Sequence, residues 1–368
     1  MYLQKLTLVN FKNISQADLA FSRKLNCFVG GNGAGKTNII DAIHYLSMCK
    51  SAFNLTDGQS VMHGCDFFVA EGQYVLGEDR RENICCGFRR NGGKTLKRNG
   101  KEYEKLSEHI GLLPVVLVSP ADTSLIHESG DERRRYLNTL LSQLDREYLS
   151  SLIRYNHVLA ERNRLLKQAI PPEAGELLEV LDEQLVRFGN ILYEKRKALI
   201  EKLTPVAEKY YAVLSDDRET IGLSYKSDLN DMPFGETLRN ARERDRVLQH
   251  TTTGIHRDDI RMSIGGHALR KYGSQGQQKS FLVALRLAQF EIIFSECGYK
   301  PLLLLDDIFD KLDMQRVERL IRLVSDQRFG QIFITDSNKV RLDLILGNIE
   351  REYKLFNVEN GTIREEQA

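Results

Sequence analysis

The chain has 368 residues, which is longer than one ordinary domain and long enough for two or more hydrophobic cores. With 52 Lys and Arg residues against 51 Asp and Glu residues, the formal net charge is +1, so an acidic partner must be met by a local basic patch. No apolar run is long enough for a membrane helix and the N-terminus lacks the apolar region of a signal peptide, so we expect a cytoplasmic protein with no membrane partner.

The N-terminal segment is predicted to form strands that lead into a glycine-rich loop. Apolar and polar residues alternate over 3–11 as in a strand, a second short strand covers 18–21, and the apolar run 25–29 is a third. Residues 30–38, GGNGAGKTN, match the pattern G-x-x-x-x-G-K-[ST], and the residues from 39 onward are predicted to be helical. Strand, glycine loop and helix in this order are the context that a phosphate-binding loop requires.

The glycine loop is expected to bind ATP. Its backbone N–H groups can converge on the phosphates, and the helix that follows adds the positive end of its dipole. Lys36 would reach the β- and γ-phosphates, and the Thr37 hydroxyl would hold Mg²⁺. A glycine turn that binds nothing is the alternative, which the flanking strand and helix disfavour. The predicted ATP-binding residues of the loop are Gly30, Gly31, Asn32, Gly33, Ala34, Gly35, Lys36, Thr37 and Asn38.

An antiparallel β region follows, and it is rich in basic residues. The runs 67–76 and 83–89 are predicted strands, and Asn91-Gly92 and Asn99-Gly100 are hairpin turn signals. Glu82 is the only acid between Arg80 and Lys101, so this region could follow a phosphate backbone without reading bases. A solvated hairpin is the alternative reading. The candidate DNA contacts are Arg89, Arg90, Lys94, Lys97 and Arg98.

Between about 131 and 214 the composition becomes that of charged helices. The apolar residues Leu149, Leu152, Ile153, Leu159 and Leu166 predict one buried stripe, and a second stripe runs from 177 to 192. Pro171-Pro172 separates the two helices, so an antiparallel helical hairpin is predicted. The basic residues Arg154, Arg162, Arg164 and Lys167 are interpreted as ordinary helix-face partners of nearby glutamates. Before this arm, the apolar run 112–118 predicts a strand that is buried on both faces.

Two further motifs lie near the C-terminus. The run Leu302–Leu305 predicts a buried strand, and Asp306 at its end could hold the magnesium ion while Asp307 orients the attacking water. Asp306 lies 270 residues after Lys36, so a large insertion must separate the two halves of the site. The segment Ser274, Gln275, Gly276 and Gln277 begins a long helix, predicted over 277–295, and offers a second group of phosphate donors; an ordinary helix N-cap is the alternative.

With these motifs in this order, the chain resembles the ATPase heads of the ABC superfamily. Gly30–Thr37 matches the Walker A loop, 274–278 a variant signature loop and Leu302–Asp307 the Walker B strand, and Asp313 falls at the D-loop. Patches such as Asn10-Phe11-Lys12-Asn13 and Thr253–Asp259 resemble the bacterial RecF family in particular, and this resemblance adds Lys12 to the ATP-binding set. It implies an α/β fold: an ABC-type P-loop ATPase head with an antiparallel β subdomain and a short inserted helical arm. The implied domains are 1–125 and 251–368 for the head and 126–250 for the arm.

The resemblance also implies a function. In that family ATP, bound by the Walker motifs of one subunit, is covered by the signature loop of a second, so Ser274–Gln277 would act in trans in a homodimer. The dimer would close on double-stranded, gapped or junction DNA, work with the mediator proteins RecO and RecR to load recombinase at gaps, and take part in replication restart and SOS induction.

Some features depart from the superfamily pattern. Asp307 stands where many members have a catalytic Glu, which predicts slow ATP hydrolysis; no Gln matches the Q-loop near Asp122; and the strand 331–336 carries no switch histidine. The alternatives are the ATP-binding subunit of an ABC transporter, an SMC-type chromosome-organising ATPase, and a nucleotide-gated scaffold that does not bind DNA. The missing histidine and the variant signature loop count against the first, and the short arm counts against the second.

Overall fold

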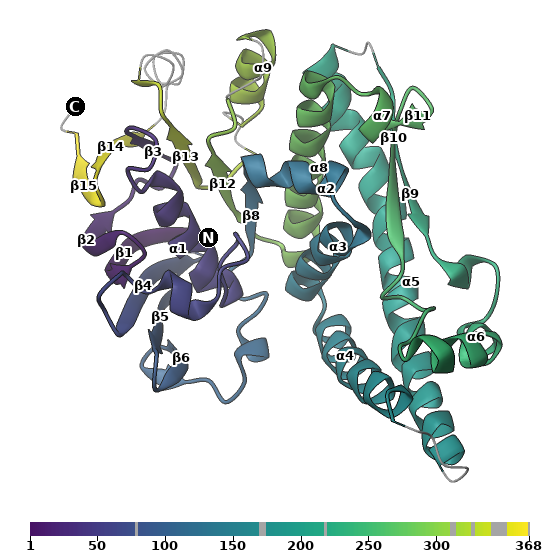
Figure 1. Ribbon diagram of the computed structural model, residues 1–368. Helices are drawn as coiled ribbons and strands as arrows, with labels where there is room; N and C mark the ends of the chain where they lie inside the picture. Colours follow the sequence, from purple (N-terminus) through teal and green to yellow (C-terminus); the bar gives the residue numbers. More distant parts are fainter. Residues whose placement is uncertain are drawn as a thin grey trace. The chain divides into compact units, whose positions relative to one another are not determined.

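The computed structural model describes residues 1–77, 80–168, 174–216, 219–309, 314–324, 328–339 and 352–366. The chain divides into two compact units, whose elements are labelled in Figure 1. The first unit comprises Met1–Asp122, Val213–Asp217 and Gln275–Ala368, and the second comprises Thr123–Ala212 and Arg218–Ser274. Residues 251–274 thus belong to the second unit, whereas the boundaries expected from the sequence assigned them to the head.

One six-stranded sheet of the first unit is antiparallel, in the order β2-β1-β4-β5-β6-β7. The predicted alternation holds over β1, because Leu3, Leu6, Leu8 and Phe11 are all buried. The predicted Asn99-Gly100 turn is present, with positive φ angles of 51° and 82° that suit Asn and Gly. The strands are β1 (Tyr2–Phe11), β2 (Ile14–Ala20), β4 (Phe67–Leu76), β5 (Arg80–Arg89), β6 (Gly93–Arg98) and β7 (Lys101–Glu102).

The second six-stranded sheet has the order β15-β14-β3-β13-β12-β8 and is parallel except for β15. Every residue of β3, β12 and β13 is buried, as continuous apolar runs predict for strands covered on both faces. The strand predicted over 112–118 is shorter than expected: it begins after Pro114, which has no N–H to donate. The strands are β3 (Leu25–Val29), β8 (Val115–Val118), β12 (Leu302–Asp306), β13 (Ile332–Asp336), β14 (Tyr353–Glu359) and β15 (Thr362–Glu365).

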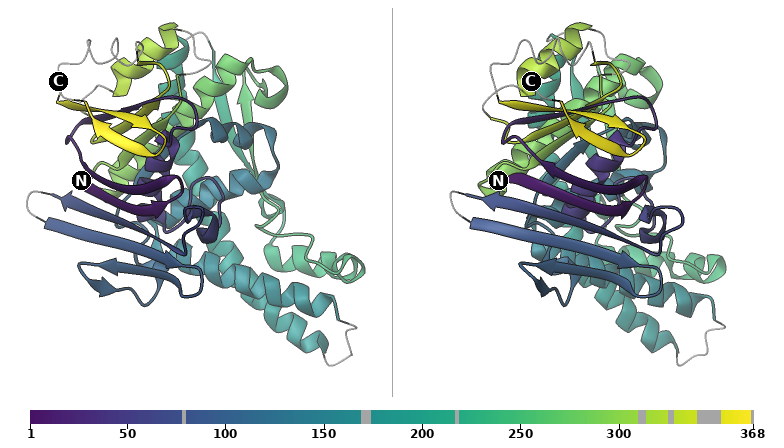
Figure 2. Two further views of the ribbon diagram at one scale, coloured as in Figure 1. Left: turned by 60° about the vertical axis from the view of Figure 1, so that its left-hand side comes forward. Right: turned by 90° about the vertical axis from the view of Figure 1, so that its left-hand side faces the viewer.

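Helix α1 (Lys36–Met48) packs between these two sheets, touching β1 and β4 on one side and β12 and β13 on the other. Figure 2 shows the two sheets as separate layers. Their facing side chains form one hydrophobic core, in which Phe28, Phe333 and Phe356 of the parallel sheet meet residues such as Ile39 of the helix. Helix α8 (Gln275–Cys297) packs against β8, and α9 (Met314–Val324) follows β12 in the chain. The core therefore fixes the start of α1 against the ends of the parallel strands.

The second unit contains most of the helical arm and a small sheet. Helix α4 (Arg146–Leu166) lies beside α5 (Ala174–Ser215), as the predicted hairpin requires, whereas Pro171 and Pro172 lie outside the described residues. The sheet, in the order β11-β10-β9, had no counterpart among the predicted strands. Its strands are β9 (Ile221–Lys226), β10 (Asp259–Ile264) and β11 (His267–Ala268), and the other helices are α2 (Ser124–His127), α3 (Gly130–Leu144), α6 (Phe234–Leu248) and α7 (Leu269–Tyr272).

The buried face of α4 differs from the predicted apolar stripe. It consists of Tyr148, Ser151, Tyr155, Val158, Arg162 and Leu166, while Ile153 of the predicted stripe is 51% exposed. Arg162 is fully buried, so its interpretation as a surface partner of Glu161 is wrong. The reason is that buried tyrosines and a paired arginine contribute to this core, which a reading of aliphatic residues alone misses. Among the described residues no helix is both long and apolar enough to cross a membrane.

Candidate nucleotide-binding site

The glycine loop lies between β3 and α1 and is closely confined by its neighbours. Gly33 and Gly35 have φ angles of 78° and 116°, which residues with a Cβ rarely adopt. A Cβ at Gly30 would come within 2.1 Å of the carbonyl oxygen of Val358, and one at Gly35 within 2.8 Å of Asn13 Oδ1. Three of the loop's four glycines are therefore required by backbone conformation or by space, while its middle residues, 31–33, are exposed.

Lys36 and Thr37 begin α1 beneath this loop. Lys36 is 7% exposed, and its Nζ donates hydrogen bonds to the carbonyl oxygens of Gly30 at 2.7 Å and Gly31 at 2.9 Å. The ammonium group is thus folded back over the loop, where it adds positive charge. Thr37 Oγ1 donates to the Asp306 carboxylate, at 3.0 Å from Oδ1 and 3.1 Å from Oδ2. The structure brings together the two halves of the site that lie far apart in sequence.

The Asp306 carboxylate is held by a second hydroxyl that the sequence reasoning missed. Thr335 Oγ1, at the end of β13, donates to Asp306 Oδ1 at 2.7 Å and accepts from the backbone N–H of Asp307 at 3.0 Å. Burial raises the pKa of Asp306, a neighbouring charge on Asp307 adds to the rise, and the hydrogen bonds from Thr335 and Thr37 oppose it. The available signal was position: Thr335 is the last residue but one of β13, the strand between β3 and β12.

Asp307 lies directly after the Walker B strand in a left-handed conformation. Its φ is 47°, which is uncommon for a residue with a side chain, although Asp tolerates it better than most. The hydrogen bonds from its N–H to Thr335 fix this turn. Non-glycine residues in sparsely populated conformations are found disproportionately at functional sites. The role of Asp307 beside the metal position stays a prediction.

A C-terminal hairpin supports the glycine loop from behind. The N–H of Gly361, in the turn between β14 and β15, donates to Ala34 O at 2.8 Å. Asn13 Nδ2 donates to the same carbonyl at 3.2 Å, and Asn13 Oδ1 accepts from Asn38 Nδ2 at 2.7 Å. Neither Gly361 nor Asn13 was among the predicted site residues. Their contacts span the chain from its first turn to its last hairpin, which no local pattern reveals.

Lys12, which the resemblance placed in the ATP-binding set, is engaged within the protein. Its Nζ lies 2.6 Å from the buried carboxylate of Asp41 on α1 and 5.4 Å from the centre of the Phe53 ring. Its φ of 54° shows that the turn after β1 is sharp at this point. The structure thus shows a structural partner for Lys12, and its contact with nucleotide stays a prediction.

Asp122, near the expected Q-loop position, forms an ion pair with the helix that follows the signature loop. Arg286 of α8 donates to both carboxylate oxygens of Asp122, with its Nη2 2.5 Å from Oδ1. The same carboxylate accepts from the N–H of Ser119 at the end of β8. Asp122 therefore ties α8 to the parallel sheet.

The signature segment crosses the boundary between the two units. Ser274 is the last residue of the second unit. Gln275 is exposed, and it is the first residue both of the first unit's last segment and of α8. A Cβ at Gly276 would lie 3.1 Å from Nη1 of Arg316, on α9, so the first turn of α8 has a guanidinium beside it. Asp313, the predicted D-loop residue, lies outside the described residues.

The five candidate DNA contacts of the β region divide into two groups. Lys94 forms an ion pair with Asp57 at 2.8 Å, Arg98 binds the buried carboxylate of Glu82 through two nitrogens, and Arg90 donates to a backbone carbonyl. The side chains of Arg89 and Lys97 are exposed and form no ion pair within the described part of the chain. The sequence pattern therefore overestimated the basic charge that this region offers to a partner.

The residues present fit a nucleotide and a divalent cation. A Cβ at Gly30 or Gly35 would collide with neighbouring atoms, and the cation that faces the loop is Lys36. Thr37 Oγ1 and the Asp306 carboxylate already lie within hydrogen-bond distance of each other, and a hydroxyl with a carboxylate is the oxygen donor set that Mg²⁺ prefers. When bound, the cation would neutralise charge on the phosphates.

Comparisons with known proteins agree with this geometry. The family model described as "RecF/RecN/SMC N terminal domain" matches residues 2–364. Proteins named "DNA replication and repair protein RecF" from Bacteroides thetaiotaomicron and Parabacteroides distasonis are 48% and 50% identical over 365 and 364 residues, and each alignment covers 99% of both chains. A solved structure of RecF-ATP "in RecFOR pathway" superposes with a TM-score of 0.89 at 29% identity, covering 100% of this chain and 98% of that one. An Smc head from Pyrococcus furiosus, at 18% identity and a TM-score of 0.59, shares the fold. The chain therefore belongs to the RecF family.

Proposed function

We propose that this protein is an ATP-dependent DNA clamp of recombinational repair. The observation that carries the proposal is the meeting of Lys36, Thr37 and Asp306 at one edge of the parallel sheet, in a chain that aligns over almost its full length with relatives named for DNA replication and repair. Lys36 and the loop N–H groups would bind the triphosphate, and Thr37 with Asp306 would hold Mg²⁺. ATP binding would favour a homodimer closed on DNA, and ATP hydrolysis would open this dimer and release the DNA.

A homodimer completes this site in the proposed mechanism. Ser274 and Gln275 are exposed, so the start of α8 is accessible to a second copy of the chain. Exposed N–H groups and the dipole at a helix start attract phosphate, which supports a role for this segment against the nucleotide of the partner. Asp307 would orient the attacking water, and hydrolysis would be slow enough to act as a timer rather than as a motor. RecO and RecR are the proposed protein partners at gaps and junctions.

The test is the binding of fluorescent gapped duplex DNA to the purified protein without nucleotide, with ADP and with ATP. We expect ATP to tighten binding and to increase the mass of the protein in solution, and Lys36→Ala to lose both effects. Ser274→Ala should keep ATP binding by the monomer and lose ATP-driven dimerisation. Loss of monomer binding by Ser274→Ala would show that the segment acts in cis. If ATP does not enhance DNA binding, the clamp is rejected in favour of a protein scaffold or a transporter subunit.

A further inference from the structure

A long stretch of the chain around the signature segment contains no acidic residue. Residues 260–290 include Arg261, Arg270, Lys271, Lys279 and Arg286 but neither Asp nor Glu. At the chain's average composition, a stretch of this length would hold about four acids. Arg286 is paired with Asp122 from outside the stretch. Arg261, Arg270 and Lys271 are exposed, and they form no ion pair with the residues that the structure describes.

These three residues belong to one projecting element, which we call the basic hairpin and define as residues 259–272, comprising β10, β11 and α7. Its tip is Gly265-Gly266, with φ angles of 54° and 78°, and Ile264 pairs with His267 across it. Positive φ at both central residues is typical of the tightest two-residue hairpin turn. Residues 265–268 are exposed, so partner backbone could approach the tip closely.

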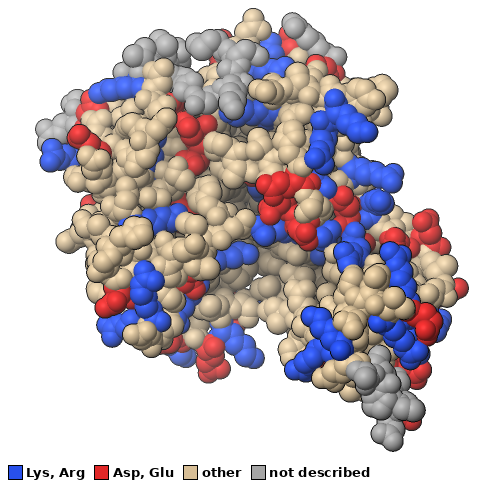
Figure 3. Space-filling model, viewed as in Figure 1, with Lys and Arg blue, Asp and Glu red and all other residues tan. Residues whose placement is uncertain are grey.

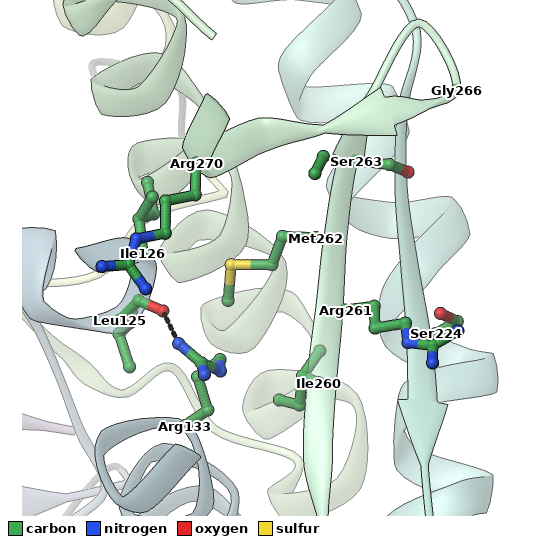
Figure 4. A pocket seen from close by; sticks show the side chains of 11 residues that line it. Leu125, Ile126, Arg133, Ser224, Ile260, Arg261, Met262, Ser263, Gly266 and Arg270 are labelled. Carbon is green, nitrogen blue, oxygen red and sulfur yellow. Dashed lines mark hydrogen bonds between the residues drawn. The ribbon is translucent and has the colours of Figure 1, made fainter. Parts of the chain in front are cut away.

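The basic hairpin carries positive charge on both faces. Arg261 pairs in register with Ser224 of β9, and Figure 4 shows its side chain on the opposite side of β10 from Ile260 and Met262. Arg270 reaches from α7 over the Met262 side, at a pocket of about 460 Å³ that also borders Arg133. Figure 3 shows Lys and Arg side chains on the surface over α7 and β10.

The two arginines at the pocket differ in what they can offer a ligand. Arg133 Nε lies 2.5 Å from Asp259 Oδ1, its Nη2 also binds Asp259, and its Nη1 donates to the carbonyl oxygens of Leu125 and Glu128. It is therefore a fixed part of the wall. Arg270 is not committed to a described acid, so its charge is available at the mouth of the pocket.

We propose that the basic hairpin contacts the phosphate backbone of duplex DNA, an assignment that rests on the proposed clamp function. Phosphates attract Arg and Lys whatever the base sequence, and an element with such residues on both faces can meet phosphates on either side when it lies in a groove. Tyr272, 68% exposed with its ring 5.1 Å from that of His267, adds an aromatic surface beside Lys271. An acidic peptide seated in the pocket would not account for Lys271 and Tyr272, which are exposed and do not line it.

The test measures the salt dependence of binding to gapped duplex DNA in the presence of ATP, over about 0.05–0.3 M NaCl. For the double variant Arg270→Gln/Lys271→Gln we expect binding about ten-fold weaker near 0.15 M salt, with the slope of log K against log [NaCl] shallower by about two, one for each lost phosphate contact. Arg261→Gln should make the slope shallower by about one. The matched control is Arg239→Gln/Arg244→Gln, which removes the same charge from exposed positions of α6, a helix with no predicted DNA contact, and should leave the slope unchanged.

The outcomes separate this assignment from the proposed function. If the wild-type protein shows no ATP-enhanced DNA binding, the clamp itself fails. If it does, and Arg270→Gln/Lys271→Gln and Arg261→Gln both keep the wild-type slope, the hairpin does not contact DNA and an acidic protein ligand takes its place. Because Arg270 and Lys271 lie close to Ser274 in sequence, ATP-driven dimerisation of each variant is measured in parallel. Should the double variant fail to dimerise, the slope of Arg261→Gln decides the assignment.

Discussion

Thr335 Oγ1 and Asp306 Oδ1 lie 2.7 Å apart at the ends of two neighbouring parallel strands, β13 and β12. The same hydroxyl accepts from the N–H of Asp307, so one side chain orients two consecutive acids. A carboxylate buried at this depth needs hydrogen bonds to stay ionised, and Thr37 supplies the only other one recorded within the described residues. The hydrogen bond from Thr335 therefore favours the charged form of Asp306, against the burial that raises its pKa.

We predict that Thr335→Val lowers the rate of ATP hydrolysis by about ten-fold or more, because a lost hydrogen bond to a charged group costs about 1.5–3 kcal/mol. Val has nearly the shape of Thr, so the core around β13 should keep its packing. Thr335→Ser is the matched control, since it restores the hydroxyl and should recover most of the rate. Equal activity of all three proteins in a steady-state phosphate-release assay would rule out this role.

Gly361 gives a second prediction about the support of the glycine loop. A Cβ there would lie 2.1 Å from Asn13 O, and its φ is 79°. Gly361→Ala must shift the hairpin that hydrogen-bonds Ala34, so we expect weaker ATP binding and lower stability. Gly93→Ala is the control: its φ of 76° imposes a similar backbone penalty, of about 1–2 kcal/mol, but a Cβ there meets nothing within 4 Å. Isothermal titration with ATP should show a loss of affinity in Gly361→Ala alone; an equal loss in both variants would contradict it.

Arg162 leads to a prediction about the helical unit. Its side chain is fully buried, its Nε donates to Asp182 at 2.6 Å, and its Nη1 donates to Asp245 at 2.7 Å and to Thr251 at 2.9 Å. Arg162→Met leaves the carboxylate of Asp245, itself 0% exposed, buried without its cation. The expected cost in unfolding free energy is about 3–5 kcal/mol.

A double variant distinguishes a lost charge pair from lost packing. Arg162→Met/Asp245→Asn also removes the buried charge of Asp245, so no carboxylate is left there without its cation. Urea denaturation should therefore show that the double variant is more stable than Arg162→Met alone. If the double variant is as unstable as the sum of the single variants, the ion pair is not what the site depends on. Exposed Arg164→Met, at the same helix, should change stability little.

Much of the nucleotide site could be predicted from the sequence because its chemistry is local. The loop 30–38, the strand 302–306 and the helix start at 275 each carry their own pattern of glycines, apolar residues or polar caps. The parallel sheet followed from the same runs, since strands buried on both faces are continuously apolar. What local patterns lacked were the partners that come from elsewhere in the chain: Thr335 for Asp306, and Gly361 and Asn13 for the glycine loop.

Charge was the least predictable feature. Arg98 and Lys94 looked free in the sequence because their partners, Glu82 and Asp57, are distant along the chain but near in the fold. Arg162 looked like a surface residue because Glu161 is its neighbour, yet the helix places it on the buried face. Which basic residues remain available to a partner is decided by such pairings, and they emerge only from the tertiary structure.

Three histidines with lowered pKa values make the protein sensitive to mild acid: His256, which is half-buried, and His44 and His109, which are buried. Burial lowers the pKa of both His256 and His44 to about 4 from an ordinary value of 6.5. His256 is held neutral: the Tyr155 hydroxyl donates to Nδ1 at 2.9 Å, which leaves the Nε2 proton for the carbonyl oxygen of Thr251 at 3.1 Å. Below pH 6.5 His256 and His44 take up protons in the unfolded chain, whereas in the folded chain they stay neutral until the pH approaches 4. The free energy of unfolding therefore falls as the pH falls from about 6.5 towards 4, and it is unaffected above 7.

We therefore expect His256 alone to cost about 1–2 kcal/mol of unfolding free energy between pH 7.5 and pH 5. His256→Gln keeps a donor for the Thr251 carbonyl but does not titrate. Urea denaturation at the two pH values should therefore show a loss of unfolding free energy that is smaller than in the wild-type protein by this amount, whatever the variant's stability at pH 7.5. His157→Gln serves as the control, because the His157 side chain is 72% exposed and its removal should leave the pH dependence unchanged. The same loss in His256→Gln as in the wild-type protein would place the acid sensitivity elsewhere, with His44 of α1 the next residue to replace.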